Sequence, residues 1–145
     1  MTQSTMKRST LFLFFFLLLS MYSITGMAQQ KNKVLVFFKT SGFYHQSITA
    51  GKNALLQLGK TNGFDVDTTK DASLFNKQNL SQYAAVVFLN TTGDVLNDKQ
   101  QLAFEQYIQS GKGFVGIHAA TDTEYDWPWY GNLVGAYFLS HPKIQ

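Results

Sequence analysis

The 145-residue chain contains no cysteine and a single arginine, Arg8. The absence of cysteine excludes a disulfide framework and a thiolate nucleophile. A domain without disulfides must be stabilised by an ordinary hydrophobic core, and the composition, 45% hydrophobic against 14% charged residues, supplies one. Because guanidinium groups, which bind phosphate through two parallel hydrogen bonds, are nearly absent, we do not expect nucleic-acid binding.

The first 28 residues have the layout of a secretory signal peptide. Lys7 and Arg8 precede an apolar run at 11–19, which is followed by polar residues and by small residues before a cleavage site at Ala28. The run is shorter than the ~20 residues that span a bilayer, so we expect no stable membrane insertion after cleavage. Cleavage leaves ten lysines and nine acidic residues, a net charge of +1. The sequence therefore predicts a secreted or periplasmic protein with one domain at 29–145.

From Lys33 onward, short apolar runs alternate with segments of helical periodicity. The pattern predicts helices over 46–58 and from an N-cap at Asn97 to Gly111, and strands at 34–38, 64–68, 84–89 and 114–117. Strands that alternate with helices indicate an α/β fold, a parallel sheet with helices on both faces. Four strands are few for such a domain, and the chain stops without a closing element. We therefore expect a C-terminally truncated domain.

Three loops of this predicted sheet are rich in polar and aromatic residues. In parallel sheets, ligands bind beyond the carboxyl ends of the strands. This rule selects residues 39–46, which contain His45, residues 90–94, which begin with Asn90, and residues 118–129. We therefore expect these loops to form one site.

His118 follows the last predicted strand, between Gly116-Ile117 and two alanines. Small neighbours at such an elbow let a side chain project above the sheet, and an imidazole suits a general acid, a general base or a metal ligand. Asp122, Glu124 and Asp126 follow, and carboxylates near a histidine can orient the ring or share a proton. In the alternative interpretation, His118 holds a loop, Asp122 caps a turn and Glu124 points into water. The candidate catalytic residues are His118 and Asp122.

Aromatic residues and two further histidines complete the candidate site. Aromatic rings can stack on the C–H face of a sugar, although they are equally common as packing material in long loops. The three histidines could form a zinc site if the fold brings them together, but their spacing matches no local ligand motif, so the metal is left open. The candidate substrate-binding residues are His45, Asn90, Tyr125, Asp126, Trp127, Tyr130 and His141.

The chain resembles the ThuA-like (trehalose utilisation) family of the class I glutamine amidotransferase-like superfamily. The resemblance covers about 33–145 and rests on KTSGFYH at 39–45, FLNTTG at 88–93, GFVGIHAATD at 113–122, YDWPWY at 125–130 and the pair His141-Pro142. It implies a flavodoxin-like fold in which His118 occupies the elbow that carries the catalytic cysteine in true amidotransferases. Cysteine-dependent glutamine hydrolysis is therefore not expected.

The resemblance also implies a function in sugar catabolism. We expect an exported protein that acts on or binds a small-molecule carbohydrate, trehalose or a related sugar derivative, at the carboxyl edge of the sheet. A sugar-acting hydrolase is one such enzyme, and no cofactor is identified. Exported members of the family are often joined to other carbohydrate-related domains, so fusion to or association with them is expected. The alternative is a non-catalytic carbohydrate-binding or scaffolding domain.

Overall fold

A four-stranded parallel sheet forms the centre of the computed structural model, which describes residues 32–142. The strands follow the order β2-β1-β3-β4 and comprise β1 (Lys33–Phe37), β2 (Asp65–Thr69), β3 (Ala85–Leu89) and β4 (Gly113–Ile117). Each begins within one residue of its predicted position. The predicted signal peptide, 1–28, lies outside the described residues.

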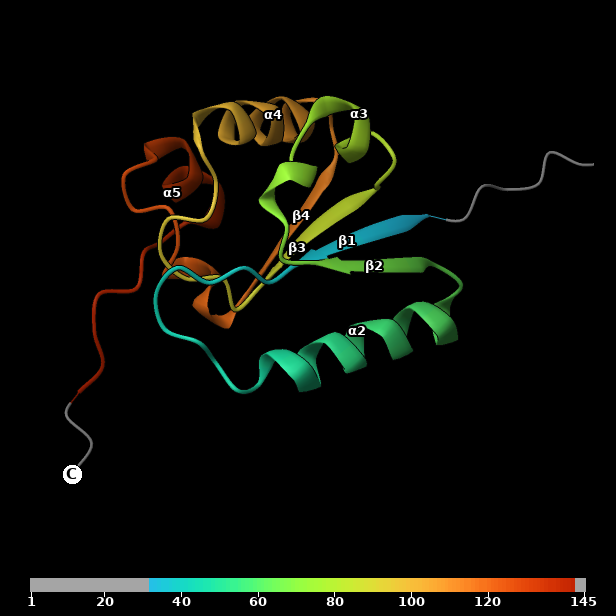
Figure 1. The fold of residues 1–145 in the computed structure, drawn as a ribbon, viewed down its shortest axis with the longest axis horizontal. Coiled ribbons are helices and arrows are strands. Elements are labelled where there is room, and N and C mark those ends of the chain that lie inside the picture. Colours follow the sequence, from blue (N-terminus) through green and yellow to red (C-terminus); the bar gives the residue numbers. More distant parts are fainter. Residues whose placement is uncertain (1–31, 143–145) are drawn as a thin grey trace, which may run out of the picture. The chain divides into compact units, whose positions relative to one another are not determined.

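Helices cover both faces of the sheet (Figure 1). One face carries α2 (Ile48–Asn62), and the other carries α3 (Lys77–Leu80), α4 (Asp98–Gln109) and α5 (Pro128–Val134). Two 3₁₀ turns, η1 (Ala72–Leu74) and η2 (His118–Thr121), complete the elements. None of the helices in residues 32–142 is long and apolar enough to cross a bilayer. This is the α/β, flavodoxin-like arrangement that the sequence predicts.

Of the two long helices, α4 begins at a side-chain cap and α2 ends at a glycine. The Asn97 side chain accepts from the Gln100 N–H while the Gln100 side chain accepts from the Asn97 N–H, a capping box that starts α4 as predicted. α2 continues past Leu58, where the sequence predicts its end, and stops before Gly63, whose φ of 75° favours glycine. At Gly59 the helix lies so close to the chain after it that a Cβ would sit 2.7 Å from the Phe64 carbonyl oxygen.

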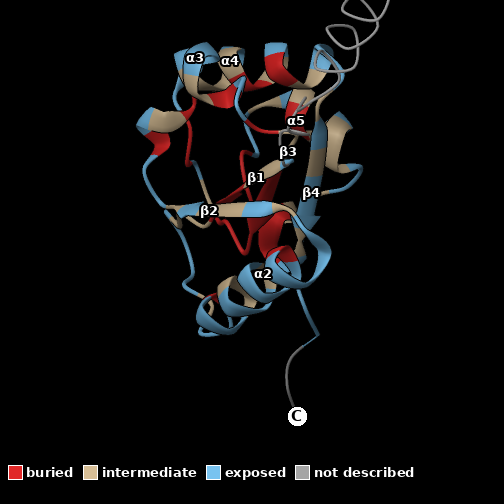
Figure 2. Ribbon diagram, turned by 90° about the vertical axis from the view of Figure 1, so that its right-hand side faces the viewer, coloured by how far each residue is buried: buried red, intermediate tan, exposed pale blue. Residues whose placement is uncertain are grey.

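The core consists of two clusters, one on each face of the sheet. Buried residues gather along the central strands in Figure 2. Beneath α2 the cluster is small and aliphatic, with Val36, Val87 and Leu89 fully enclosed. The opposite cluster is larger and aromatic, and the Phe88 ring at its centre contacts the rings of Phe37, Phe75, Phe104, Phe114 and Tyr130. The aromatic cluster therefore joins the sheet to α4, α5 and the segment before α3.

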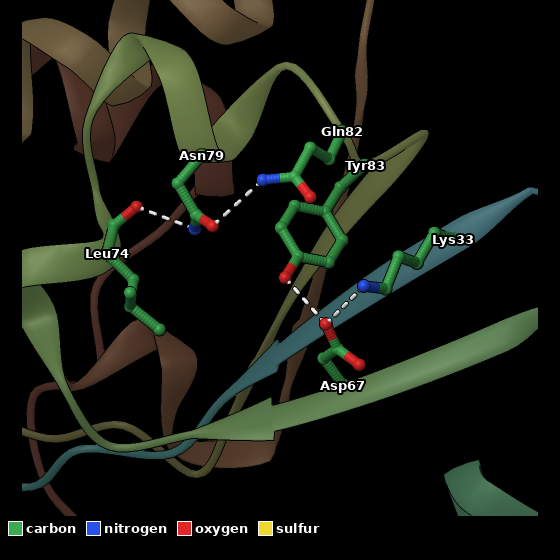
Figure 3. A network of polar contacts seen from close by, with 6 residues as sticks. All are labelled: Lys33, Asp67, Leu74, Asn79, Gln82 and Tyr83. Atoms are coloured by element: carbon green, nitrogen blue, oxygen red, sulfur yellow. Dashed lines mark hydrogen bonds and ion pairs between the residues drawn. The ribbon is translucent and has the colours of Figure 1, made fainter.

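A polar cluster ties the sheet to the segment after α3 (Figure 3). The Asp67 carboxylate on β2 contacts the Lys33 ammonium on β1 at 2.7 Å and accepts a hydrogen bond from the Tyr83 hydroxyl at 2.7 Å. Burial raises the pKa of Asp67, but its hydrogen bonds with Lys33 and Tyr83 prevail and hold that pKa below its usual value. Burial and the same carboxylate raise the pKa of Tyr83 to about 12, so the phenol stays a donor.

Candidate functional site

The loops after β1, β3 and β4 are joined to one another at the carboxyl edge of the sheet. Thr40 pairs with Thr92, and Gly93 pairs with Thr123, as isolated parallel bridges beyond the strands. The Gly93 N–H also donates to the Asp122 carbonyl at 2.7 Å. The structure thus brings together the three loops that the strand-end rule selects.

A cleft of about 340 Å³ lies among these loops, within the roughly 300–1,000 Å³ typical of ligand sites. Two lining residues come from the loop after β1, four come from the turn after β4, and two come from the segment after α5. We call this space the histidine cleft, and it is lined by Phe43, His45, His118, Ala119, Thr121, Asp122, Phe138 and His141. All three histidines of the chain therefore line one space.

His118 sits at a strained elbow. Its φ is 51°, in the left-handed region that residues other than glycine rarely adopt. Asn90 follows β3 as His118 follows β4, and its φ is 52°. Because Leu89 pairs with Ile117, these two left-handed residues begin adjacent loops. Each such conformation costs about 1–3 kcal/mol, and strain of this kind clusters at functional sites.

His45 and His118 meet edge to face, with ring centroids 4.7 Å apart. Burial lowers the pKa of His45 below its ordinary 6.5, the neighbouring His118 lowers it further, and the Asp122 charge opposes both. At pH 7 the His45 imidazole is therefore mostly neutral and can accept a proton. The cleft thus combines a neutral base with a second imidazole and a carboxylate.

Tyr125 fixes the carboxylate side of the cleft. Its hydroxyl lies 2.7 Å from Asp122 Oδ1 and 2.6 Å from the Phe138 carbonyl oxygen, and it donates its single proton to one of them at a time. Burial, followed by the hydrogen bond and charge of Asp122, raises the pKa of Tyr125 to about 12. The Phe138 N–H donates to the Thr121 carbonyl at 2.9 Å, so the segment after α5 is held against the cleft.

Comparisons with known proteins agree with this architecture. The model of the ThuA family, described as trehalose utilisation, matches residues 33–145. The chain belongs to the ThuA family. A crystal structure of a ThuA-like protein from Bacteroides uniformis ATCC 8492 is 26% identical, with a TM-score of 0.61 over 77% of this chain. The match covers 47% of that solved chain, so this ThuA-family chain spans about half the length of its relative. No curated protein matches it.

Glu124 of this ThuA-family chain is a buried anchor, so the interpretation that it points into water is wrong. Its side chain is 1% exposed. Its Oε1 accepts from the N–H groups of Val95 and Leu96 at 2.8 Å each, and its Oε2 accepts from the Gln101 amide at 2.6 Å. Burial raises the pKa of Glu124, and these three hydrogen bonds oppose that effect. Glu124 therefore joins the loops after β3 and β4.

The rings of Trp127 and Tyr130, which the sequence predicts to stack on a sugar, do not line the histidine cleft. Tyr130 is 0% exposed in the aromatic core, where its hydroxyl donates to the Ala120 carbonyl at 2.7 Å. The Trp127 ring stacks on those of Trp129 and Tyr130. The structure therefore places both residues in packing. Asp126 is exposed and is not among the cleft residues.

The aromatic rings that do line the cleft belong to Phe43 and Phe138. Phe43 is 69% exposed, and its ring lies edge to face on His45 with centroids 4.9 Å apart. Phe43 could have been selected from the sequence, because it lies in the loop after the first strand. Phe138 could not, since its place depends on its bonds to Tyr125 and Thr121.

The polar residues of the site show no preformed metal centre. Within residues 32–142, no group of three or more histidine, aspartate or glutamate side chains is arranged to hold an ion. His141 lies beside Phe138, with ring centroids 4.9 Å apart. Asn90 lies 3% exposed at the end of β3, where its side-chain N–H donates to the Ser47 hydroxyl at 2.8 Å. The histidine cleft is thus lined by hydrogen-bonding side chains and by the rings of Phe43 and Phe138.

Proposed function

We propose that this protein takes part in the utilisation of trehalose or a related sugar, and that it acts on or binds the sugar derivative in the histidine cleft. The observation that carries the proposal is the convergence of His45, His118 and Asp122 beside the exposed ring of Phe43. An aromatic face suits the C–H side of a sugar ring, and imidazole and carboxylate groups suit its hydroxyls. The description of the family, trehalose utilisation, agrees with this chemistry.

The proposed chemistry is the removal of a proton from a sugar hydroxyl or from the carbon that carries it. His45 is the group that accepts the proton, because its pKa is lowered and its ring is mostly neutral at pH 7. His118 contacts the same substrate group from the elbow, and Asp122, held by Tyr125, stabilises positive charge that develops on either ring. A hydrolase that cleaves a sugar derivative would use the groups in these roles.

Phe43→Ala tests the location of the sugar. Removing the stacking ring should weaken binding about 2- to 13-fold, because such contacts contribute roughly 0.5–1.5 kcal/mol. We would measure the affinity for trehalose by calorimetry or by changes in amide chemical shifts. Tyr44→Ala is the matched control, since Tyr44 is 49% exposed in the same loop but does not line the cleft. Equal losses in the two variants would argue against the histidine cleft as the sugar site.

A second candidate function is a non-catalytic carbohydrate-binding or scaffolding domain. One observation favours it: the chain has no cysteine, and a histidine, His118, occupies the elbow at which true amidotransferases carry their nucleophile. Binding of a sugar without turnover would support this function.

We also propose export to the periplasm or the exterior, where the protein would associate with other carbohydrate-related domains. The support is the order of charged, apolar and small residues before Ala28. The intact mass of the protein recovered from producing cells should correspond to a chain that begins at Gln29. A mass that includes residues 1–28 would contradict export by this route.

A further inference from the structure

We infer that a second hollow, which shares His118 with the histidine cleft, binds a neutral, hydroxyl-bearing group of the same ligand. The inference rests on the proposed function and extends it, because it assigns the ligand two parts, one on each side of the elbow. Three observations carry it: an enclosed amide oxygen without a partner, walls without formal charge, and the pair of left-handed strand ends.

The second hollow has a volume of about 440 Å³. One wall is the first two turns of α2, and the other consists of the carboxyl ends of β3 and β4. We call it the α2 hollow, and it is lined by Ser47, Ala50, Gly51, Ala54, Leu89, Asn90, Ile117 and His118. His118 lines the histidine cleft as well, so both spaces border the elbow.

Asn90, which lines the α2 hollow, carries a buried side-chain oxygen that no described residue contacts by a hydrogen bond. Its side-chain N–H donates to the Ser47 hydroxyl at 2.8 Å, while its Oδ1 has no hydrogen-bond partner among the described residues. Turning the amide by 180° would let Ser47 donate to Oδ1 and would leave Nδ2 without a partner instead. Buried side-chain polar atoms are nearly always hydrogen-bonded, so an unpartnered one in a residue 3% exposed points to a ligand.

The backbone holds Asn90 in this position at a cost. Asn90 and His118 adopt φ values of 52° and 51°, and they follow strands that are paired through Leu89 and Ile117. The Asn90 N–H donates to the Ile117 carbonyl at 3.2 Å, which links the two strand ends directly. A left-handed backbone at two neighbouring strand ends places an amide and an imidazole at the same edge, as expected where both contact one ligand.

The remaining walls define the class of ligand. No lysine, arginine, aspartate or glutamate lines the α2 hollow, so it offers a phosphate or carboxylate no counter-charge. The wall formed by α2 carries only small residues, Ala50, Gly51 and Ala54. At Gly51, α2 lies so close to β3 that a Cβ would be 2.8 Å from a Leu89 side-chain carbon. Leu89 and Ile117 add an apolar floor. A neutral ring with C–H faces and hydroxyl edges fits these walls.

Trehalose has two such rings, whereas glucose has one. A ligand with one ring in the histidine cleft and one in the α2 hollow would place the bond between its rings beside His118. We therefore expect trehalose to bind at least 10-fold more tightly than glucose. Trehalose 6-phosphate should bind more weakly than trehalose, since neither space is lined by lysine or arginine.

Ala54→Phe, which fills the α2 hollow from an exposed helix position, is the decisive variant. It should lower the affinity for trehalose to the level measured for glucose with the unaltered protein. Asn53→Phe adds the same ring at the next exposed position of α2, outside the hollow, and should leave both affinities unchanged. Amide chemical shifts provide a second readout: trehalose should shift the signals of Gly51 and Asp122, and glucose should shift that of Asp122 alone.

The outcomes separate this inference from the proposed function. If glucose and trehalose bind equally, or if Ala54→Phe and Asn53→Phe give the same affinity for trehalose, the second hollow is not a subsite, while sugar binding in the histidine cleft stands. Tighter binding of trehalose 6-phosphate would overturn the neutral class of ligand. If neither sugar binds the unaltered protein, the proposed function and the inference both fail.

Discussion

Glu124→Ala should lower the free energy of unfolding by about 3–5 kcal/mol, because two buried backbone donors and a half-buried amide lose their acceptor at once. The backbone N–H groups of Val95 and Leu96 and the amide of Gln101 all donate to this carboxylate. Each unsatisfied buried group costs roughly 1–3 kcal/mol, and the 1% exposure of Glu124 leaves little access for water to replace the bonds. Loss of the side chain also leaves a cavity beneath the loops.

Urea unfolding at pH 7 measures this effect, and two variants bracket it. Glu105→Ala removes a glutamate that accepts one exposed hydrogen bond, from Gln109, and should change the stability by less than about 0.5 kcal/mol. Glu124→Gln keeps an oxygen for Val95 and Leu96 but turns an amide toward Gln101, so its loss should lie between the other two. A loss for Glu124→Ala no larger than that for Glu105→Ala would show that Glu124 does not anchor the loops.

The fold could be predicted because its signals are local. The run AAVVFL at 84–89 could be buried on both faces only as a central strand, and β3 lies between β1 and β4. The capping box at Asn97 and Gln100 marked the start of α4 by its own hydrogen bonds. α5 was not predicted, although Pro128 at its first turn and Gly135 after it are typical helix signals. The aromatic residues around Pro128 were interpreted as a ligand surface instead.

The site could be predicted only in part, because the direction of a side chain depends on tertiary packing. The strand-end rule selected the loops that supply His45, His118 and Asp122, and the structure brings these residues to one cleft. No sequence signal shows that Glu124 adopts a φ of 55°, which turns its carboxylate inward. Nor does the composition distinguish the buried ring of Tyr130 from the exposed ring of Phe43.

His118→Asn should reduce turnover of the sugar derivative by at least about 100-fold, the usual lower limit for loss of a general acid or base. Asparagine tolerates the left-handed φ of 51° better than alanine does, so this variant removes the imidazole while keeping the elbow. The assay is product formation from trehalose and related sugars that bind. Unchanged turnover would remove His118 from the mechanism, and binding without turnover in the unaltered protein would favour the non-catalytic function.

His118→Asn can also be tested without substrate, through the pKa of His45. Because His118 lowers the pKa of His45, its loss should raise that pKa toward 6.5. Asp122→Asn should lower it instead, because the Asp122 charge raises the pKa of His45 in the intact protein. NMR titration of the His45 ring protons measures both shifts. Shifts of the same sign in the two variants would contradict the coupling among the three groups.

These opposite shifts also determine how pH should act on the cleft. A His45 pKa below 6.5 means that most of the rings are neutral at pH 7, so catalysis by the neutral form should fall as the pH drops through the His45 pKa. In His118→Asn that acidic limb should move to higher pH, and in Asp122→Asn it should move to lower pH. The imidazole at the elbow would then act in two ways, by contact with the ligand and by keeping its neighbour neutral. If His118 had a merely structural role, the limb of His118→Asn would stay in place, while that of Asp122→Asn would still move to lower pH.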